Sequence, residues 1–425
     1  MIGASERTRT VDTMDRSGAG KRLLICSAGV PHERDGASVV LFYHYVARLK
    51  REGHVIWHLL LLDPSWSDEA VDAYRRKLGS PGTFDVVVIR ATAFYRSGRL
   101  RPHCDADAAA AAGRQARAFA PQAILCFDIL AAWLLDGVTA VPRIVWLGDL
   151  NFETFFYHSL YATRENPMRA IHLPSNWLSC RGWRHLYARV LSDVDQVIVA
   201  SHSSERALGR LGVVAEYEPY PWPTAATTAR TAAPPARPSF LFFGQLAGLG
   251  SRSAFHFLMD KVFPLLRERW GAGGFRIMLA GRGAPPDWVL AAILDKPEIE
   301  RLGFVEKLDD MLAICHAVLV PIDVPVGNRS RILTAMAMRS LIIAHANTAL
   351  GNPDLVDGAT CYLASDAEDF VSAMAAAVDD PARRTAIIER AFRCYQERFH
   401  PERATSRLAK RVETLFSRSA ANASA

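Results

Sequence analysis

Short apolar runs alternate with helix-length stretches along most of the chain. The runs are continuous in Val, Ile, Leu and Phe, which indicates strands of a parallel sheet that are buried on both faces. In the first half the runs cover residues 22–28, 55–62, 84–90, 123–127, 143–147 and 195–200. In the second half they cover residues 239–243, 275–280, 317–321 and 341–344.

The stretches between the runs carry apolar residues at the spacing of amphipathic helices. Residues 37–52 and 253–269 show this pattern clearly, and the first of them is followed by Gly53, a common helix stop. Strands that alternate with helices in this way predict α/β domains of the doubly wound type.

A proline-rich segment at residues 219–238 separates the two sets of strands and contains six prolines. Such segments act as semi-rigid spacers, and the change in composition marks a domain boundary. We therefore predict a Rossmann-like domain over residues 21–218 and a second over residues 239–395. Residues 396–425 are predicted as a helix and tail. The polar residues 1–20 lack the apolar core of a signal peptide and are predicted as a disordered tail.

Composition and charge narrow the class of protein. The 425 residues suit two domains, and no apolar run approaches the roughly 18 residues of a membrane span. The seven cysteines include no CxxC pair, which argues against a disulfide framework or zinc site and predicts a cytoplasmic location. The net charge of +6 comes without a Lys/Arg block or a nucleic-acid motif, so we expect no nucleic-acid partner.

A glycine-rich loop follows the strand at residues 239–243. It contains Gly244, Gly248 and Gly250, and Arg252 stands near the start of the next helix. Glycines let the backbone approach a phosphate, and a helix N-terminus offers free N–H groups to it. Arg252 would add a charge-assisted bond to a diphosphate. The alternative is an ordinary strand-to-helix turn with spare glycines.

Three further segments follow strands of the second half. Gly281 ends one strand, Gly303 precedes Phe304 and Val305, and Gly327 precedes a helix start that carries Arg329 and Arg331. Ligands of open α/β sheets bind at the carboxyl ends of the strands. These segments are therefore candidates for one site.

The order of these segments resembles the GT-B fold glycosyltransferases of the retaining family 4. The resemblance covers about residues 22–417 and is most specific over residues 240–360. There the family has a strand with a glycine loop, a strand ending in Gly, a Gly-Phe-Val segment and a motif that ends in K-i-L-E-A-M-A. The corresponding motif is Arg-Ile-Leu-Thr-Ala-Met-Ala at residues 331–337. The family Lys is thus Arg331, and the family Glu is Thr334.

This resemblance implies two Rossmann-like domains that face each other across a cleft. It implies transfer of a sugar from a nucleotide-sugar donor with retention of configuration, without a metal and without a cofactor. The donor would bind the C-terminal domain, where Arg331 would have a catalytic role on the leaving diphosphate. The implied donor-binding residues are Gly244, Gly248, Gly250, Arg252, Gly281, Phe304, Val305, Arg329, Arg331 and Thr334. Thr334 would hold the ribose more weakly than the family Glu.

The N-terminal half supplies the candidates for the acceptor side. The family places a Gly-rich loop after the first strand, where this chain has His32, Asp35 and Gly36. Asp149 follows the strand at residues 143–147 and is the second catalytic candidate, since it could orient an acceptor hydroxyl or take its proton. The alternative for Asp149 is a helix cap.

Several alternatives remain open on the sequence alone. The acceptor could be a glycan, a lipid-linked molecule or a small molecule. Residues 176–191 mix Trp and Tyr with Arg, as in helices that rest on an anionic membrane, here its inner face; the alternative is a core helix with a solvated basic side. Two other functions on the same fold are a nucleotide-sugar epimerase and a non-catalytic scaffold, and Thr334 favours the scaffold. The Asp-x-Asp sequences at residues 105–107 and 193–195 are predicted as caps and turns rather than metal ligands.

Overall fold

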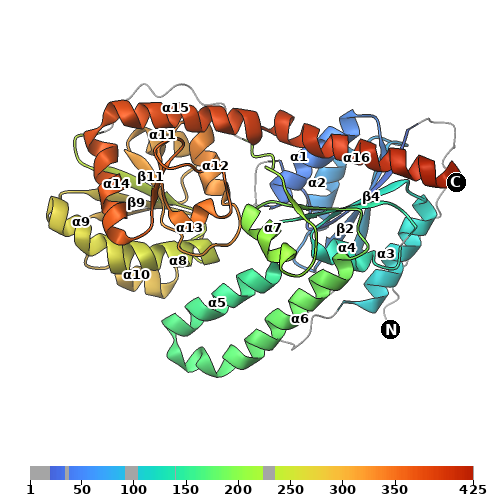
Figure 1. The fold of residues 1–425 in the computed structure, drawn as a ribbon, viewed down its shortest axis with the longest axis horizontal. Helices are drawn as coiled ribbons and strands as arrows, with labels where there is room; N and C mark the ends of the chain where they lie inside the picture. Colours follow the sequence, from blue (N-terminus) through green and yellow to red (C-terminus); the bar gives the residue numbers. More distant parts are fainter. Residues whose placement is uncertain (1–19, 34–37, 91–103, 139, 224–234, 425) are drawn as a thin grey trace.

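The computed structural model describes residues 20–33, 38–90, 104–138, 140–223 and 235–424. They form two α/β domains that lie side by side, with two long C-terminal helices running along both (Figure 1). We call the domain that contains the first sheet the N-terminal domain and the domain that contains the second sheet the C-terminal domain.

The N-terminal domain is built on a seven-stranded parallel sheet with the order β3-β2-β1-β4-β5-β6-β7. The strands are β1 (Arg22–Ala28), β2 (Val55–Leu62), β3 (Phe84–Arg90), β4 (Ala123–Phe127), β5 (Arg143–Leu147), β6 (Gln196–Val199) and β7 (Glu216–Tyr217). Every residue of β4 and β5 is buried, because helices cover both faces of the sheet. The continuous apolar runs of the sequence are explained by this burial.

The helices of this domain alternate with its strands. They are α1 (Ser38–Arg51), α2 (Asp68–Leu78), α3 (Ala106–Phe119), α4 (Ile129–Leu134), α5 (Asn151–Glu165), the 3-10 turn η1 (Pro167–His172), α6 (Leu173–Leu191) and α7 (His202–Gly209). Asp105 caps α3 by accepting hydrogen bonds from two backbone N–H groups, and Asp195 accepts one from the Arg143 N–H. Asp105 is therefore the predicted cap, whereas Asp195 links the beginning of β6 to that of β5.

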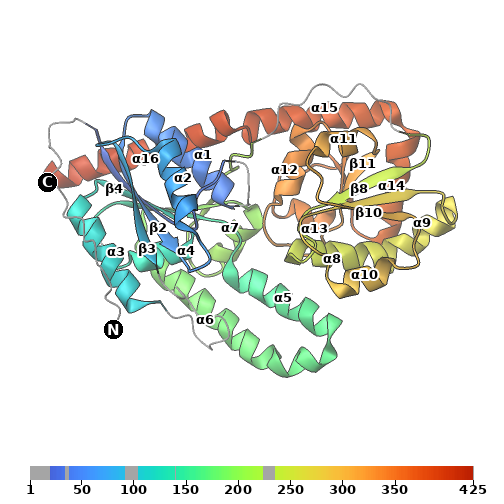
Figure 2. The same ribbon diagram turned by 180° about the vertical axis from the view of Figure 1, so that it is seen from behind.

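A helical hairpin made of α5, η1 and α6 leaves the N-terminal domain after β5. Figures 1 and 2 show it standing out below the sheet and reaching toward the C-terminal domain. Its first helix, α5, contacts α8 of the C-terminal domain. The hairpin therefore adds a packing contact between the domains.

The C-terminal domain has a six-stranded parallel sheet with the order β10-β9-β8-β11-β12-β13. The strands are β8 (Ser239–Phe243), β9 (Arg276–Ala280), β10 (Ile299–Gly303), β11 (Ala317–Val320), β12 (Ile342–His345) and β13 (Tyr362–Ala364). The helices are α8 (Leu249–Phe257), the π-helix η2 (Leu258–Val262), α9 (Phe263–Trp270), α10 (Asp287–Ile293), α11 (Leu308–Ala313), α12 (Ser330–Ala337), α13 (Ala346–Ala349) and α14 (Ala367–Asp379).

The last two helices carry the chain back to the N-terminal domain. Helix α15 (Pro381–Arg398) packs on α12, and α16 (Pro401–Ser424) packs on α1 and β4. Arg411 of α16 forms an ion pair of 2.8 Å with the buried Glu218, and Glu402 pairs with Arg48 of α1 at 3.3 Å. The C-terminal helix thus closes the N-terminal core. No helix within the described ranges is long and apolar enough to cross a membrane.

Candidate functional site

Asp149 of the N-terminal domain meets the loop that precedes α12 of the C-terminal domain. Its Oδ2 lies 3.2 Å from Nη1 of Arg329, so the two side chains form an ion pair between the domains. Gly327 has a φ of +74°, and a Cβ atom at this position would overlap the Asp149 carboxylate. Glycine is therefore required here both for the turn and for the close approach. The structure thus brings two of the predicted site residues together.

Arg331 lies directly over the predicted phosphate loop. A Cβ atom at Gly244, whose φ is +134°, would lie 2.8 Å from Nη2 of Arg331. The same Nη2 donates a hydrogen bond of 2.7 Å to Oγ of Ser251 in the first turn of α8. The guanidinium also lies over the Phe242 ring, 5.5 Å from its centroid. Arg331 is therefore fixed between the N-termini of α8 and α12.

Two guanidinium groups with unused donors share this region. Burial, and next to it the charge of Arg329, lower the pKa of Arg331 to about 10, so Arg331 stays protonated at neutral pH. Nη1 of Arg331, and Nε and Nη2 of Arg329, are buried without a hydrogen-bond partner among the described residues. Buried N–H donors without partners are costly. An anion that accepts from these donors would remove that cost and the repulsion between the two cations.

The glycines of the loop allow the close packing around these cations. Gly248 is the N-cap residue of α8, and a Cβ atom at Gly250 would contact the Arg329 guanidinium at 3.5 Å. A Cβ atom at Gly281 would overlap the carbonyl oxygen of Gly244. A side chain at Gly281 would displace the loop, whereas a Cβ atom at Gly250 would touch Arg329 only at ordinary van der Waals distance. The predicted glycines therefore have a steric role around one point of the fold.

Arg252 has a different environment from Arg329 and Arg331. Its Nε donates a hydrogen bond of 2.9 Å to Oε1 of Glu165 in α5, and its Nη2 pairs with Oε2 of the same carboxylate. Both side chains are only 16% exposed. In this structure Arg252 therefore links the hairpin to the C-terminal domain, and a donor phosphate would compete with Glu165 for it.

Thr334 is occupied by a contact that the sequence analysis missed. Its hydroxyl accepts a hydrogen bond of 2.9 Å from Nε1 of Trp222 and donates one of 3.1 Å to the Ser330 carbonyl. The Trp222 backbone is held by the Phe399 carbonyl and by the Tyr395 hydroxyl. The only sequence signal for Trp222 was an aromatic residue in a proline-rich segment. Thr334 thus joins the linker to α12.

This contact predicts a measurable coupling energy. In a double-mutant cycle with Trp222→Phe and Thr334→Val, we expect each change to lower the free energy of unfolding and the pair to couple by about 1 kcal/mol, because both remove the same hydrogen bond. Denaturant unfolding of the four proteins measures the coupling. Strictly additive effects would show that the hydrogen bond contributes nothing.

The remaining predicted residues are spread over both domains. Phe304 follows β10, is 55% exposed and lies under the Arg282 guanidinium, 4.6 Å from its ring centroid, while Val305 is partly buried. His32 is exposed, and its backbone N–H donates to the Val39 carbonyl at 3.2 Å. The predictions for Asp35 and Gly36 lie outside the described residues.

The hairpin contact adds further residues that the sequence analysis missed. The Tyr161 hydroxyl of α5 donates a hydrogen bond of 2.6 Å to Oδ1 of Asp323. His256 of α8 stacks on Trp288 at 4.9 Å and on Tyr161 at 5.8 Å between ring centroids. Arg164 of α5 pairs with Asp260 at 2.9 Å. These contacts fix α5, which begins two residues after Asp149, relative to the C-terminal domain.

Glu153 lies one turn of α5 away from Asp149 and is largely buried. Burial raises its pKa to about 7; the charge of Arg210 opposes this shift, and that of Asp149 adds to it. Its Oε2 has no hydrogen-bond partner among the described residues. The carboxyl is therefore easier to keep neutral in the folded protein than in the unfolded chain.

This raised pKa predicts how stability depends on pH. The folded pKa of about 7 is above the ordinary value of 4.5, so the unfolded chain ionises first and stability falls as the pH rises between these values. Glu153→Gln should remove this loss, by at most about 3 kcal/mol above pH 7. Denaturant unfolding at pH 5 and pH 8 measures it. An equal pH dependence in both proteins would contradict the assignment.

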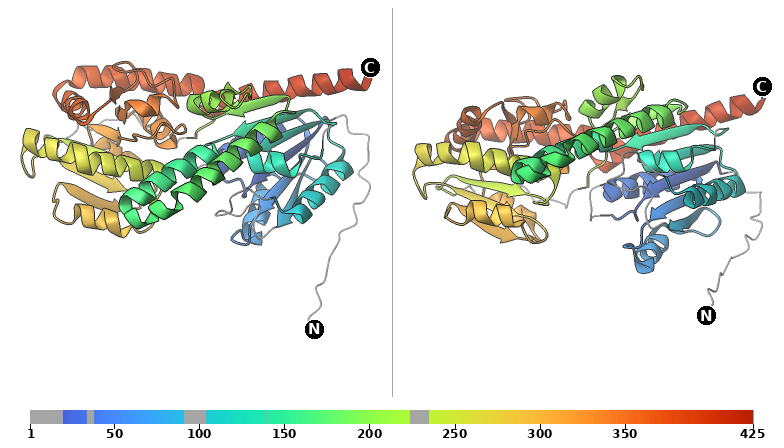
Figure 3. Two further views of the ribbon diagram at one scale, coloured as in Figure 1. Left: turned by 60° about the horizontal axis from the view of Figure 1, so that its bottom comes forward. Right: turned by 90° about the horizontal axis from the view of Figure 1, so that it is seen from below.

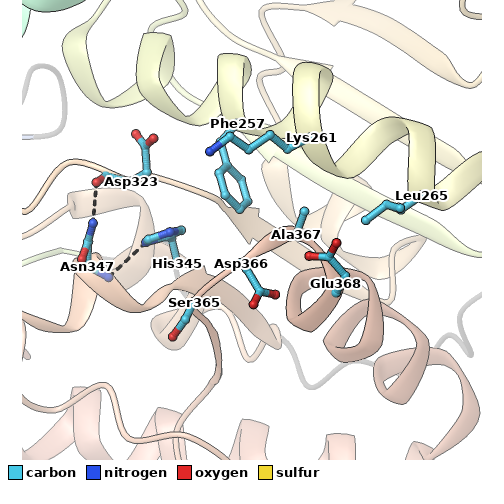
Figure 4. A pocket seen from close by; sticks show the side chains of 10 residues that line it. All are labelled: Phe257, Lys261, Leu265, Asp323, His345, Asn347, Ser365, Asp366, Ala367 and Glu368. Carbon is cyan, nitrogen blue, oxygen red and sulfur yellow. Dashed lines mark hydrogen bonds between the residues drawn. The ribbon is translucent and has the colours of Figure 1, made fainter.

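A separate pocket of about 470 Å³ lies beyond this region (Figure 4). It is lined by Phe257, Lys261, Leu265, Asp323, His345, Asn347, Ser365, Asp366, Ala367 and Glu368. None of the predicted donor-binding residues lines it. Its three carboxylates outnumber its one lysine, which disfavours a diphosphate. We therefore leave it out of the candidate site. The described residues include no group of three His, Cys, Asp or Glu side chains that could hold a metal ion.

Comparison with known proteins identifies the C-terminal domain. Residues 237–380, which contain the phosphate loop, Arg329, Arg331 and Thr334, match the family described as Glycosyl transferases group 1. The chain carries a group 1 glycosyltransferase domain. Among curated proteins, a search by sequence finds no match.

Solved structures extend the likeness from this domain to the whole chain. Sucrose-phosphate synthase (tll1590) from Thermosynechococcus elongatus is 16% identical with a TM-score of 0.63, and covers 93% of this chain and 99% of its own. A glycosyltransferase from Rickettsia africae is 12% identical with a TM-score of 0.64, and the match covers 93% of this chain and 99% of that protein. Anabaena Alr3699/HepE, solved in complex with UDP-glucose, is 13% identical with a TM-score of 0.61, and the match covers 92% of this chain and 99% of that protein. The shared architecture confirms the predicted GT-B fold, and with the family match it makes the chain a glycosyltransferase.

Proposed function

We propose that this glycosyltransferase moves a sugar from a nucleotide-sugar donor to an acceptor, with retention of configuration and without a metal ion. The observation that carries the proposal is the pair of guanidinium groups, Arg329 and Arg331, whose buried N–H donors lack partners beside the Gly244 loop. The structure of Anabaena Alr3699/HepE in complex with UDP-glucose, which has the same fold, supports a donor of this class.

The two arginines would act on the leaving diphosphate. As the bond between the sugar and the diphosphate breaks, negative charge grows on the phosphate oxygens. Fixed cations and helix N-termini at that point stabilise the transition state more than the ground state. Arg331 lies between the N-termini of α8 and α12, where both helix dipoles favour an anion. The arginines would thus supply the positive charge that a metal supplies elsewhere.

Other predicted residues would bind the rest of the donor. Phe304, exposed at the carboxyl end of β10, and the neighbouring Val305 would lie at the edge of the base. Thr334 would stay near the ribose through its contact with Trp222 rather than through a carboxylate. Arg252 would join the diphosphate site only after exchange of its Glu165 contact.

Asp149 would serve the acceptor. It comes from the N-terminal domain and is held against the donor side by Arg329. Its carboxylate would accept the hydrogen bond of the attacking hydroxyl and orient it. In the transfer, the acceptor oxygen bonds to the anomeric carbon, the bond to the phosphate oxygen breaks, and the acceptor proton passes to a carboxylate or phosphate oxygen. The same ion pair would keep the domains closed, which excludes water as a competing acceptor.

The stereochemical outcome and the metal dependence test this proposal directly. We expect the NMR spectrum of the purified product to show the anomeric configuration of the donor sugar, and we expect EDTA to leave the rate unchanged. An inverted product would overturn retention. Loss of activity in EDTA that Mg²⁺ or Mn²⁺ restores would overturn the assignment of the metal's role to the arginines.

A further inference from the structure

The helical hairpin of α5, η1 and α6 exposes an unusual amount of apolar surface. Six of the eleven large hydrophobic side chains that are exposed among the described residues lie on it: Phe156, Leu160, Met168, Ile171, Trp177 and Leu178. Met168 is 76% exposed, Ile171 74% and Trp177 55%. Several exposed apolar side chains gathered on one helical hairpin indicate an interaction surface, whereas single exposed hydrophobic residues do not. We call this group the hairpin surface.

The exposed charges of the hairpin are cationic. Its exposed charged residues are Arg164, Arg169, Arg181, Arg184 and Arg189, while both of its glutamates are partly buried. Arg164 and Arg189 pair with Asp260 and Asp136. For the other three arginines the structure records no ion pair with a described carboxylate. The hairpin surface therefore combines apolar side chains with uncompensated positive charge.

Part of the hairpin surface lies on a stripe of α5 beside the contact with the C-terminal domain. Phe156 and Leu160 are spaced by four residues and share one stripe of α5, which continues to Arg164, whose side chain pairs with Asp260 of the C-terminal domain. Tyr161 and Glu165, which bind the C-terminal domain, lie on another side of the helix. Seen from below in Figure 3, the hairpin lies in front of both domains. Phe156 and Leu160 thus stay exposed, although the stripe that they share ends in a contact with the C-terminal domain.

We propose that the hairpin surface docks on the surface of an anionic phospholipid bilayer. The membrane interface takes apolar side chains into the boundary of the acyl chains, and its headgroup phosphates accept hydrogen bonds from arginine. Trp177, with the Arg181 guanidinium 6.0 Å from its ring centroid, is the type of residue that sits at this boundary. Two copies of this chain joined through the same surface would bring their unpaired arginines together, which charge repulsion disfavours. Docking does not depend on the transfer chemistry.

Vesicle binding by the full chain tests the proposal. We expect the protein to float with vesicles of phosphatidylcholine and phosphatidylglycerol, and to bind vesicles of phosphatidylcholine alone more weakly. Ile171→Ser with Trp177→Ser should weaken binding to the anionic vesicles at least about tenfold, because two apolar side chains no longer enter the interface. Arg169→Gln with Arg181→Gln should weaken it and reduce its dependence on salt.

A matched control changes two apolar residues outside the hairpin that are even more exposed than Ile171 and Trp177. Val214→Ser with Leu294→Ser, which are 87% and 80% exposed, should bind the vesicles like the wild type. Unchanged melting temperatures show that all variants are folded. Three results would overturn the proposal: no binding of the wild type to anionic vesicles, equal binding of the Ile171/Trp177 variant, or a wild-type dimer that this variant converts to a monomer without vesicles. The last result would assign the surface to a second copy.

Discussion

Replacement of Asp149 by asparagine is expected to lower the rate of sugar transfer about 100- to 10,000-fold, the range found when a group that orients or deprotonates a nucleophile is lost. Asparagine keeps the size of the side chain against Gly327, where there is no room for a larger one. It removes the negative charge that pairs with Arg329. Donor binding should be retained, because the diphosphate is held by the arginines rather than by Asp149, and Arg329 loses the carboxylate that competes for it.

Steady-state rates and donor titration of the same protein separate these effects. Asp72→Asn, which removes an exposed carboxylate of α2 that pairs with Arg75, is the matched control and should keep the full rate. A full rate for Asp149→Asn would remove Asp149 from catalysis and leave it as a contact between the domains. If Asp149→Asn lost donor binding as well as rate, the role of Asp149 would lie in the donor site.

The Arg331→Ala variant is expected to bind the donor at least about 30-fold more weakly, because loss of one partner from a buried charged hydrogen bond costs about 2–5 kcal/mol. Arg331 is the cation closest to the Gly244 loop and is held there by Ser251. Arg329 alone cannot replace it, since it also pairs with Asp149. Without donor, the variant should be at least as stable as the wild type, because one desolvated charge and its repulsion with Arg329 are removed.

Calorimetric titration with the nucleotide-sugar measures this change. Arg269→Ala is the control for the loss of one positive charge. Arg269 pairs with Asp379 near the end of α9, seven residues before β9 begins, and so lies toward the amino edge of the sheet. Arg331→Lys should restore part of the affinity, because it keeps the charge without the fork. Equal dissociation constants for the wild type and Arg331→Ala would place the donor elsewhere.

The fold followed from the sequence where strands were long and apolar. All ten apolar runs became strands, since burial on both faces leaves a continuous hydrophobic signal. Three strands were missed. In β10 no residue is fully buried, because it forms the edge of its sheet, and β7 and β13 have only two and three residues. A short or edge strand gives no period that a sequence pattern can reveal.

The candidate site followed from the sequence only in part. The glycines at 244, 281 and 327 are needed because neighbouring groups come too close for a side chain. Their order along the chain made them recognisable as site residues. The contacts of Thr334 with Trp222 and of Arg252 with Glu165 depend on how the linker and the hairpin dock on the C-terminal domain. The two residues of each pair are 112 and 87 positions apart in the sequence, and no local pattern connects them.

The central claim is that the C-terminal domain binds a nucleotide-sugar through Arg331. A thermal-shift screen of the wild type and Arg331→Ala against UDP-, GDP-, ADP- and TDP-sugars tests it most directly. At a donor concentration of about 100 times the dissociation constant, binding adds about 2.7 kcal/mol to stability. We predict that one class of nucleotide-sugar raises the melting temperature of the wild type and raises that of Arg331→Ala by at most about a third as much, because a donor that binds about 30-fold more weakly is then at only about 3 times its dissociation constant. A wild-type melting temperature that no nucleotide-sugar raises, or an equal rise in both proteins, would contradict the claim.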